Sequence, residues 1–242
     1  HFVRRRQRQM CIRDRYDTLY RQSLDEPDTF WSEQAQLLDW HSPWSAVSET
    51  NVAKGAARWF VDAKLNVSVN CIDRHLPERA HDTAIIWEGD DPDDSQSFTY
   101  QELKIQVCRF ANALRAQGIG KGDRVCIYMP MIPEAAFAML ACARIGAIHS
   151  VVFGGFSPEA LKDRINDATC SMVITADEGV RGGKTVPLKR NVDAALAQVD
   201  CVDSVIVVKR TGCETDWVDG RDVWFHEATA AVSDDCEPEW MD

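Results

Sequence analysis

The chain has 242 residues, of which 45% are hydrophobic, and it carries a formal net charge of −11 at pH 7. This length allows one large domain or most of two, and the negative charge argues against nucleic acid as the main partner. No run of about 18 apolar residues and no secretory signal is evident, so no membrane association is predicted. The nine cysteines include no C-x-x-C pair, which favours reduced thiols in a cytoplasmic protein.

Residues 1–15 differ in charge from the rest of the chain. Their sequence, HFVRRRQRQMCIRDR, holds six arginines and one aspartate and shows no helical stripe of apolar residues. One interpretation is a basic arm that binds nucleic acid. We favour a leader that is foreign to the domain that follows, and we leave it out of the predicted fold.

Residues 16–80 are predicted to form a helical or irregular segment that wraps over a larger body. Up to residue 60, aromatic side chains lie among polar ones without the alternation of a strand. We interpret these aromatic residues as packing residues, and a stacking platform for bases is the alternative. They are Phe30, Trp31, Trp40, Trp44, Trp59 and Phe60.

Residues 81–210 are predicted to form an α/β subdomain. A hairpin opens it, with strands at 84–87 and 98–99 and a solvated acidic turn at 90–94. Thr99 and Glu102 then match a capping box, which predicts a helix start. The helix repeats apolar residues at steps of three and four, so one face is expected to be buried. That face consists of Leu103, Val107, Phe110 and Leu114.

Strands and helices then alternate to residue 208. Helices are predicted from Pro133, from Pro158 and over 188–199. The helix from Pro133 is expected to turn Ala136, Met139, Leu140 and Ala143 inward. The predicted strands, all apolar and buried, are 124–129, 151–153, 172–175 and 204–208. This order predicts an α/β fold with a mostly parallel sheet and flanking helices.

The last segment, residues 211–242, contains the turn pair Asp219-Gly220 between apolar residues, which predicts a small hairpin. After a polar run from residue 233, the chain stops where no domain end is expected. An incomplete sheet of this kind is predicted to leave an unpaired edge and exposed apolar surface, and hence poor solubility.

Two glycine turns lie at the predicted carboxyl ends of strands. Gly154 and Gly155 follow one strand, and a second turn carries Arg181 and Lys184 around Gly182-Gly183. Ligands of open parallel sheets bind at this edge, and cations beside exposed backbone N–H groups suit a phosphate. The sequence therefore favours an anion site, with a pair of ordinary solvated loops as the alternative.

No catalytic residue or metal site is predicted. Gly183-Lys184-Thr185 resembles the end of a P-loop, but the position five residues before Gly183 is Glu178 instead of glycine. No nucleophile–base pair and no metal-ligand spacing is evident. Within this chain the residues therefore predict binding and positioning and no chemical step.

Three stretches resemble the acetyl-CoA synthetases, which are AMP-forming acetate–CoA ligases of the adenylate-forming superfamily. They are NVSVNCIDRHL at 66–76, the run from Gly122 to Leu161 that contains VVFGGFSPEAL, and GVRGGKTVPLKRNVDAAL at 179–196. The resemblance covers about residues 16–242. It implies that the chain is an incomplete N-terminal part of the large domain of such an enzyme.

The resemblance also implies an activity and its substrates. These ligases activate acetate with ATP to acetyl-adenylate and pyrophosphate, and then transfer the acetyl group to CoA, releasing AMP. ATP and CoA are thus expected as substrates, with a Mg²⁺ site and the ATP-phosphate loop outside this chain. The chain alone is therefore expected to be inactive, and its oligomeric state is left open.

The part present corresponds to the family's CoA side. The resemblance implies that Arg181 and Lys184 hold the 3′-phosphate of CoA. Lys184 stands where many members have arginine, and its point charge implies weaker orientation of the phosphate. The implied CoA contacts are Phe153, Gly154, Gly155, Arg181, Gly182, Gly183 and Lys184. A ligase for propionate or another short acid, and a non-catalytic module that binds CoA or another nucleotide, remain as alternatives.

Overall fold

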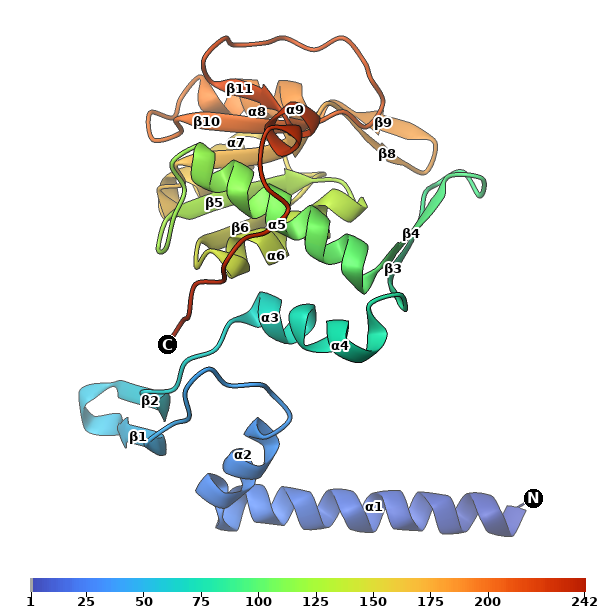
Figure 1. Ribbon diagram of the computed structural model, residues 1–242, viewed down its shortest axis with the longest axis vertical. Coiled ribbons are helices and arrows are strands. Elements are labelled where there is room, and N and C mark those ends of the chain that lie inside the picture. The colour runs from blue at the N-terminus through green and yellow to red at the C-terminus, as the bar shows by residue number, and fades with distance from the viewer. Residues whose placement is uncertain (1) are drawn as a thin grey trace. The chain divides into compact units, whose positions relative to one another are not determined.

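The structure, a computed structural model, describes the backbone of residues 2–242 and the side chains from Asp14 onward. The chain divides into two compact units, one ending at Leu65 and including Asp242, the other comprising residues 66–241. Figure 1 labels their helices and strands. The predicted boundaries after residues 15, 80 and 210 stay predictions. In the described part of the chain, no helix combines the length and the apolar character needed to cross a membrane.

The first unit contains helices and a strand pair. Its elements are α1 (Phe2–Asp25), α2 (Pro27–Ala35), β1 (Ala46–Asn51), the 3₁₀ turn η1 (Val52–Lys54) and β2 (Ala56–Val61). The two strands are antiparallel, so the prediction that residues 16–60 lack strands is wrong. The turn defines this hairpin more than the strands do. The Asn51 side chain accepts the Lys54 N–H, and Gly55 takes a φ of 62°.

The aromatic residues of this unit pack on one another. The rings of Trp40, Trp44 and Phe60 form a cluster with centroid separations of 5.2 and 5.3 Å. All three side chains are half-buried. The interpretation of these three as packing residues is therefore confirmed.

Helix α1 includes residues 2–15, although this stretch shows no helical stripe of apolar residues in the sequence. His1 and the side chains of residues 2–13 lie outside the described residues. The prediction of a foreign leader thus stays a prediction.

The second unit opens with short helical turns and the first hairpin, and the alternating part of the chain follows. Its elements are α3 (Val67–Cys71), η2 (Asp73–His75), α4 (Leu76–Arg79), β3 (Thr83–Glu88), β4 (Ser95–Thr99), α5 (Tyr100–Ala116), β5 (Arg124–Met129), α6 (Pro133–Arg144), β6 (Ile148–Phe153), α7 (Pro158–Ala168), β7 (Met172–Ala176), β8 (Gly179–Arg181), β9 (Lys184–Val186), α8 (Leu188–Leu196), β10 (Ser204–Val208), β11 (Asp222–Trp224) and α9 (Phe225–Ala230).

A parallel sheet with the strand order β11-β10-β7-β5-β6 organises this unit. The chain steps from β5 to β6 in one direction and then crosses back to place β7 on the other side of β5. Since such crossovers are right-handed, α6 covers one face and α7 and α8 cover the other (Figure 1). The predicted α/β fold class is confirmed.

The strongest sequence patterns match the structure closely. Thr99 caps α5, because its hydroxyl accepts the Glu102 N–H at 3.2 Å while the Glu102 carboxylate accepts the Thr99 N–H at 2.8 Å. All four apolar residues predicted to be buried on α5 are buried. Strands β5 and β10 coincide with their predicted ranges.

Helix α6 buries a different face from the one predicted. Ala136, Met139, Leu140 and Ala143 are only half-buried, and the fully covered residues are Phe137, Ala138, Ala141 and Cys142. The helix packs against α5 as well as against β5 and β6. Its covered face therefore includes the small alanines that allow helices to approach closely.

The predicted C-terminal hairpin is also wrong. The turn at Asp219-Gly220 leads into β11, which pairs with β10 in parallel, Val205 opposite Asp222 and Val207 opposite Trp224. The strand is fixed in part by Trp217, whose ring stacks on Trp224 with centroids 4.5 Å apart.

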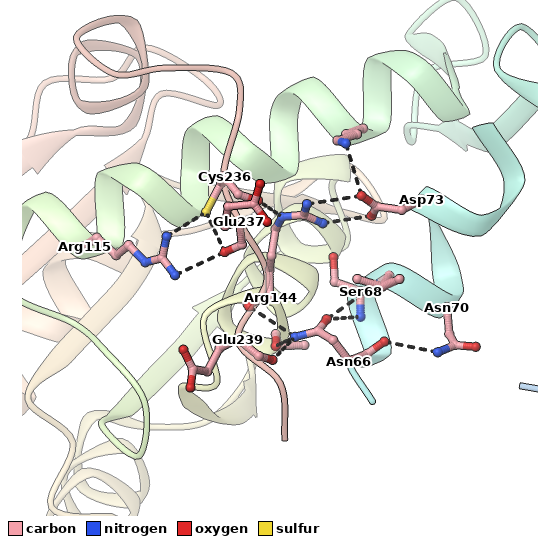
Figure 2. Close-up of polar contacts among 12 residues, drawn as sticks. Asn66, Ser68, Asn70, Asp73, Arg115, Arg144, Cys236, Glu237 and Glu239 are labelled. Carbon is pink, nitrogen blue, oxygen red and sulfur yellow. Dashed lines mark hydrogen bonds and ion pairs between the residues drawn. The ribbon is translucent and has the colours of Figure 1, made fainter. Parts of the chain in front are cut away.

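Arg144, at the end of α6, ties three segments together in the interior (Figure 2). Its side chain is 2% exposed and forms a two-pronged ion pair with Asp73 at 2.8 and 3.1 Å. Its Nε donates to the Cys236 carbonyl at 2.6 Å. The Asn66 amide donates to the carbonyls of Arg144 and Glu239. We call residues 233–240, held by these contacts, the C-terminal strap.

A second buried ionic network lies where α8 meets β11. The Lys189 ammonium, which is fully buried, lies 2.8 Å from Asp193 and 2.9 Å from Asp222. Arg221 pairs with the same two carboxylates. Burial alone raises the pKa of Asp222, but hydrogen bonds from Arg221 and Lys189 outweigh that and lower it, so the carboxylate stays charged.

Strand β6 is the edge of the sheet, and its predicted burial is only partly correct. Val152 is buried, whereas Val151 and Phe153 are 56% and 54% exposed, because β6 pairs with β5 alone and one of its faces has no cover. Among the described residues, Met131 (88%) and Ile148 (56%) are exposed as well.

We expect this uncovered edge to make the isolated chain aggregate. Light scattering of purified protein should rise with concentration in the micromolar range. Val151→Lys should reduce it more than Val218→Lys, which changes an exposed valine away from the sheet edge. A monomer that melts sharply at high concentration would contradict this expectation.

Candidate functional site

A cleft of about 620 Å³ opens at the carboxyl ends of β5 and β6. The loop after β5 contributes Pro130 and Met131, and β8 follows just after β7, on the other side of β5. This is where the strand order reverses, the usual ligand site of an open α/β sheet. The lining residues are Trp87, Glu88, Gly89, Asp90, Met129, Pro130, Met131, Ile132, Val151, Val152, Phe153, Gly154, Gly155, Gly179, Val180, Arg181, Val186, Leu188 and Arg210.

The Phe153-Gly154-Gly155 turn packs closely against the end of β5. A side chain on Gly154 would place its Cβ 3.2 Å from the Met129 carbonyl oxygen, so only glycine fits without displacing backbone. The Tyr128 hydroxyl lies 3.1 Å from the Gly154 carbonyl and donates to the Phe156 carbonyl at 2.8 Å. The turn therefore has a fixed shape at the floor of the cleft.

The second predicted turn is the tip of a β-hairpin. Strands β8 and β9 pair with Arg181 opposite Lys184. Gly182 and Gly183 take φ values of 57° and 71°, which glycine adopts without strain. Only five residues separate the end of β7 from the tip. The hairpin therefore begins at the carboxyl edge of the sheet, where the cleft lies.

The structure brings the two predicted turns together. The Arg181 guanidinium lies 5.2 Å from the centroid of the Phe153 ring, within the range of a cation–π contact. Phe153, Gly154, Gly155 and Arg181 all line the cleft. Gly182, Gly183 and Lys184 form the exposed hairpin tip beside this lining. That these residues contact CoA stays a prediction.

Sequence reasoning missed one wall of the cleft, the β3–β4 hairpin. The Trp87 indole N–H donates to the Met131 carbonyl at 2.6 Å, and the Arg210 guanidinium lies 5.1 Å above the Trp87 ring. Burial raises the pKa of Glu134, and the nearby charge of Arg210 acts against that rise. Arg210 lies just after β10, as Gly154 lies just after β6. Because ligands bind at the carboxyl ends of parallel strands, this position could have indicated Arg210 as a site residue.

A smaller, polar cleft of about 390 Å³ has four acidic residues among its eight lining residues, Asp177, Glu178, Glu214 and Asp216. Its Asp177 carboxylate is already used, since it accepts the backbone N–H groups of Arg210, Thr211 and Gly212. Carboxylates repel a phosphate, so the larger cleft fits an anionic ligand better.

The larger cleft can bind and orient a ligand, but it holds no evident acid–base or nucleophilic machinery. Burial raises the pKa of the Cys126 and Cys142 thiols to about 12, which keeps both protonated and unreactive. Among the described residues, no group of three or more His, Cys, Asp or Glu side chains could hold a metal ion.

Comparison with known proteins supports a common origin for residues 16–240. The family described as AMP-binding enzyme matches residues 72–240, and the acetyl-coenzyme A synthetase N-terminus family matches residues 16–71. Acetyl-coenzyme A synthetase 2 of Pseudomonas putida is 66% identical, over 94% of this chain and 35% of that protein. Acetyl-coenzyme A synthetase of Alcanivorax borkumensis is 63% identical, over 95% and 36%.

A solved structure shows the same fold. The acetoacetyl-CoA synthetase from Streptomyces lividans superposes with a TM-score of 0.84 at 28% sequence identity, over 93% of this chain and 34% of that chain. The chain thus spans about a third of the length of the relatives it matches. With its parallel sheet and its sequence in agreement, the chain belongs to the family of AMP-binding enzymes.

Proposed function

We propose that this chain forms the CoA-facing part of an acetyl-CoA synthetase. The complete enzyme would use ATP to activate acetate as acetyl-adenylate, and would then transfer the acetyl group to CoA with release of AMP. The proposal draws on relatives that are named acetyl-coenzyme A synthetase at 63–66% identity. It assigns this chain a binding role in the cytoplasm and no catalytic residue.

The cleft is the observation that carries the proposal. It joins a fixed glycine turn, which exposes backbone to a ligand, to the cation Arg181. Apolar side chains of Met131, Val151 and Phe153 lie beside them. These features are complementary to CoA, in which a long uncharged arm is joined to a nucleotide that carries a 3′-phosphate.

Arg181→Gln tests the proposal directly. Removing the charge should weaken CoA binding about tenfold or more, because a charge-assisted hydrogen bond contributes about 1.5–3 kcal/mol. Binding of dephospho-CoA, which lacks the 3′-phosphate, should change little. Calorimetric titration of both ligands would measure the difference.

The matched control is Arg190→Gln, which removes an exposed arginine that lines the smaller cleft. It should leave both affinities unchanged. Equal weakening of CoA and dephospho-CoA by Arg181→Gln, or no binding of CoA by the unchanged chain, would count against the proposal.

Lys184→Arg should tighten CoA binding about two- to threefold. Lys184 pairs with Arg181 across the hairpin, and an arginine there would add a planar two-pronged donor for phosphate. The ratio of the CoA and dephospho-CoA dissociation constants is the measurement. An unchanged ratio would remove Lys184 from the proposed phosphate site.

One observation favours a second candidate, a ligase for another short acid such as propionate. The matching solved structure is named an acetoacetyl-CoA synthetase, so the shared fold serves more than one acid. The acyl pocket and a Mg²⁺ site are assigned to no residue of this chain. Incubation with ATP, CoA and either acetate or propionate should yield no AMP from this chain alone, and AMP release would overturn that expectation.

A further inference from the structure

The β3–β4 hairpin carries an unusual concentration of negative charge into the cleft. Its turn contains Asp90, Asp91, Asp93 and Asp94, and Glu88 precedes it. Glu88 and Asp90 line the cleft together with Arg181. In Figure 1 the β3–β4 and β8–β9 hairpins reach out from the same side of the sheet.

Two carboxylates of this acidic tip, defined as residues 90–94, occupy donors in the cleft or on the hairpin beside it. The Asp90 carboxylate accepts the backbone N–H of Gly183 at 3.2 Å. The Asp94 carboxylate pairs with the Arg210 guanidinium at 2.5 Å. Gly183 belongs to the predicted phosphate turn, and Arg210 lines the cleft.

The hairpin is anchored close to its base and exposed at its tip. Trp87 fixes the base through its hydrogen bond to the Met131 carbonyl and its contact with Arg210. Asp90 and its neighbours Asp91 and Asp93 are exposed. The contact between Asp90 and Gly183 can therefore break without disturbing buried packing.

We propose that the acidic tip is an internal anion that exchanges with the phosphate of the ligand. The inference rests on the proposed function and adds two residues to it. Asp90 limits affinity by occupying the Gly183 N–H, and Arg210 becomes a further phosphate-binding residue when Asp94 releases it. A phosphate monoester carries close to two charges and three acceptor oxygens, so it outcompetes a single carboxylate for these donors.

Exchange also adds selectivity. A ligand without the phosphate gains nothing that offsets the broken contact between Asp90 and Gly183. The tip therefore penalises dephospho-CoA and other competitors that lack the 3′-phosphate more than CoA. Direct competition of this kind is local, whereas general repulsion by the net charge of the turn would act through every aspartate in it.

Asp90→Asn tests the exchange. The amide keeps the shape of the side chain and a hydrogen-bond acceptor but removes its charge. We expect CoA to bind about two- to fivefold tighter, the range of an exposed charge pair. Asp93→Asn removes the same charge from the same turn without a contact to Gly183, and it should change affinity less than twofold. Calorimetry gives the affinities, and the amide resonance of Gly183 should shift on CoA binding.

The outcomes separate the two ideas. If CoA binds the unchanged chain and Asp90→Asn binds it no tighter, the exchange is wrong while the proposed function stands. Equal tightening by Asp93→Asn, or CoA binding that leaves the Gly183 resonance in place, also overturns the exchange. Failure of CoA to bind any of the three proteins overturns both.

Discussion

Arg144→Met is expected to lower the free energy of unfolding of the second unit by about 3–5 kcal/mol. The substitution leaves the Asp73 carboxylate without its two-pronged partner and the buried Cys236 carbonyl without its donor (Figure 2). Lys104, 3.1 Å from Asp73, compensates only in part. Denaturation by urea, followed by circular dichroism, would measure the loss.

Arg79→Met is the matched control, since Arg79 is half-exposed and pairs with Asp82 on the surface. It should cost much less than Arg144→Met, because water screens this pair. Burial raises the pKa of Asp73, but Arg144 and Lys104 outweigh burial and lower it. The stability from this pair is therefore complete above the ordinary pKa of 3.8 and is lost as the pH falls through the lowered value. A cost of under 1 kcal/mol for Arg144→Met would contradict this account.

Lys189→Met is expected to cost about 3 kcal/mol, because it leaves two buried or half-buried carboxylates with one cation. Asp193 and Asp222 would then share Arg221. The substitution also removes the contact of the ammonium with the Trp217 ring, 5.9 Å away. Melting followed by tryptophan fluorescence would report both the loss and its location, since Trp217 and Trp224 lie beside the network.

Lys209→Met serves as the control for that experiment. Lys209 is exposed and follows β10 directly, so the same chemical change there removes no buried charge. We expect a change within about 0.5 kcal/mol. If the two lysine variants melt alike, the buried network contributes little and the strand β11 is held by apolar packing instead.

Much of the parallel sheet could be predicted from the sequence, for a physical reason. Helix α5 and strands β5 and β10 have long apolar patterns with clear ends, and such patterns depend on burial alone. Strand β11 could not be predicted in this way, because its sequence DVW is short and its position depends on pairing with β10. The hairpin of β1 and β2 was missed likewise, because the turn at Asn51 and Gly55 defines it and its strands, AVSETN and AARWFV, show no alternation of apolar and polar residues.

The candidate site was likewise predicted only in part from the sequence. Glycines and cations after apolar strands indicated the floor of the cleft at Gly154 and one cation at Arg181. The opposite wall depends on contacts across long separations, such as Asp94 with Arg210, 116 residues apart. Charges on an exposed turn look alike whether they face water or a partner. Only the three-dimensional structure separates these two cases.

The C-terminal strap has a consequence for how the protein is made. The strap brings Glu239 to Asn66, which is 173 residues away in the sequence. It also supplies the Cys236 carbonyl to Arg144, 92 residues away. During translation, the polar groups of Arg144 and Asn66 must stay hydrated until the ribosome has released the strap. We expect closure of that contact to be a late step of folding, because the residues of the strap are made last among its partners.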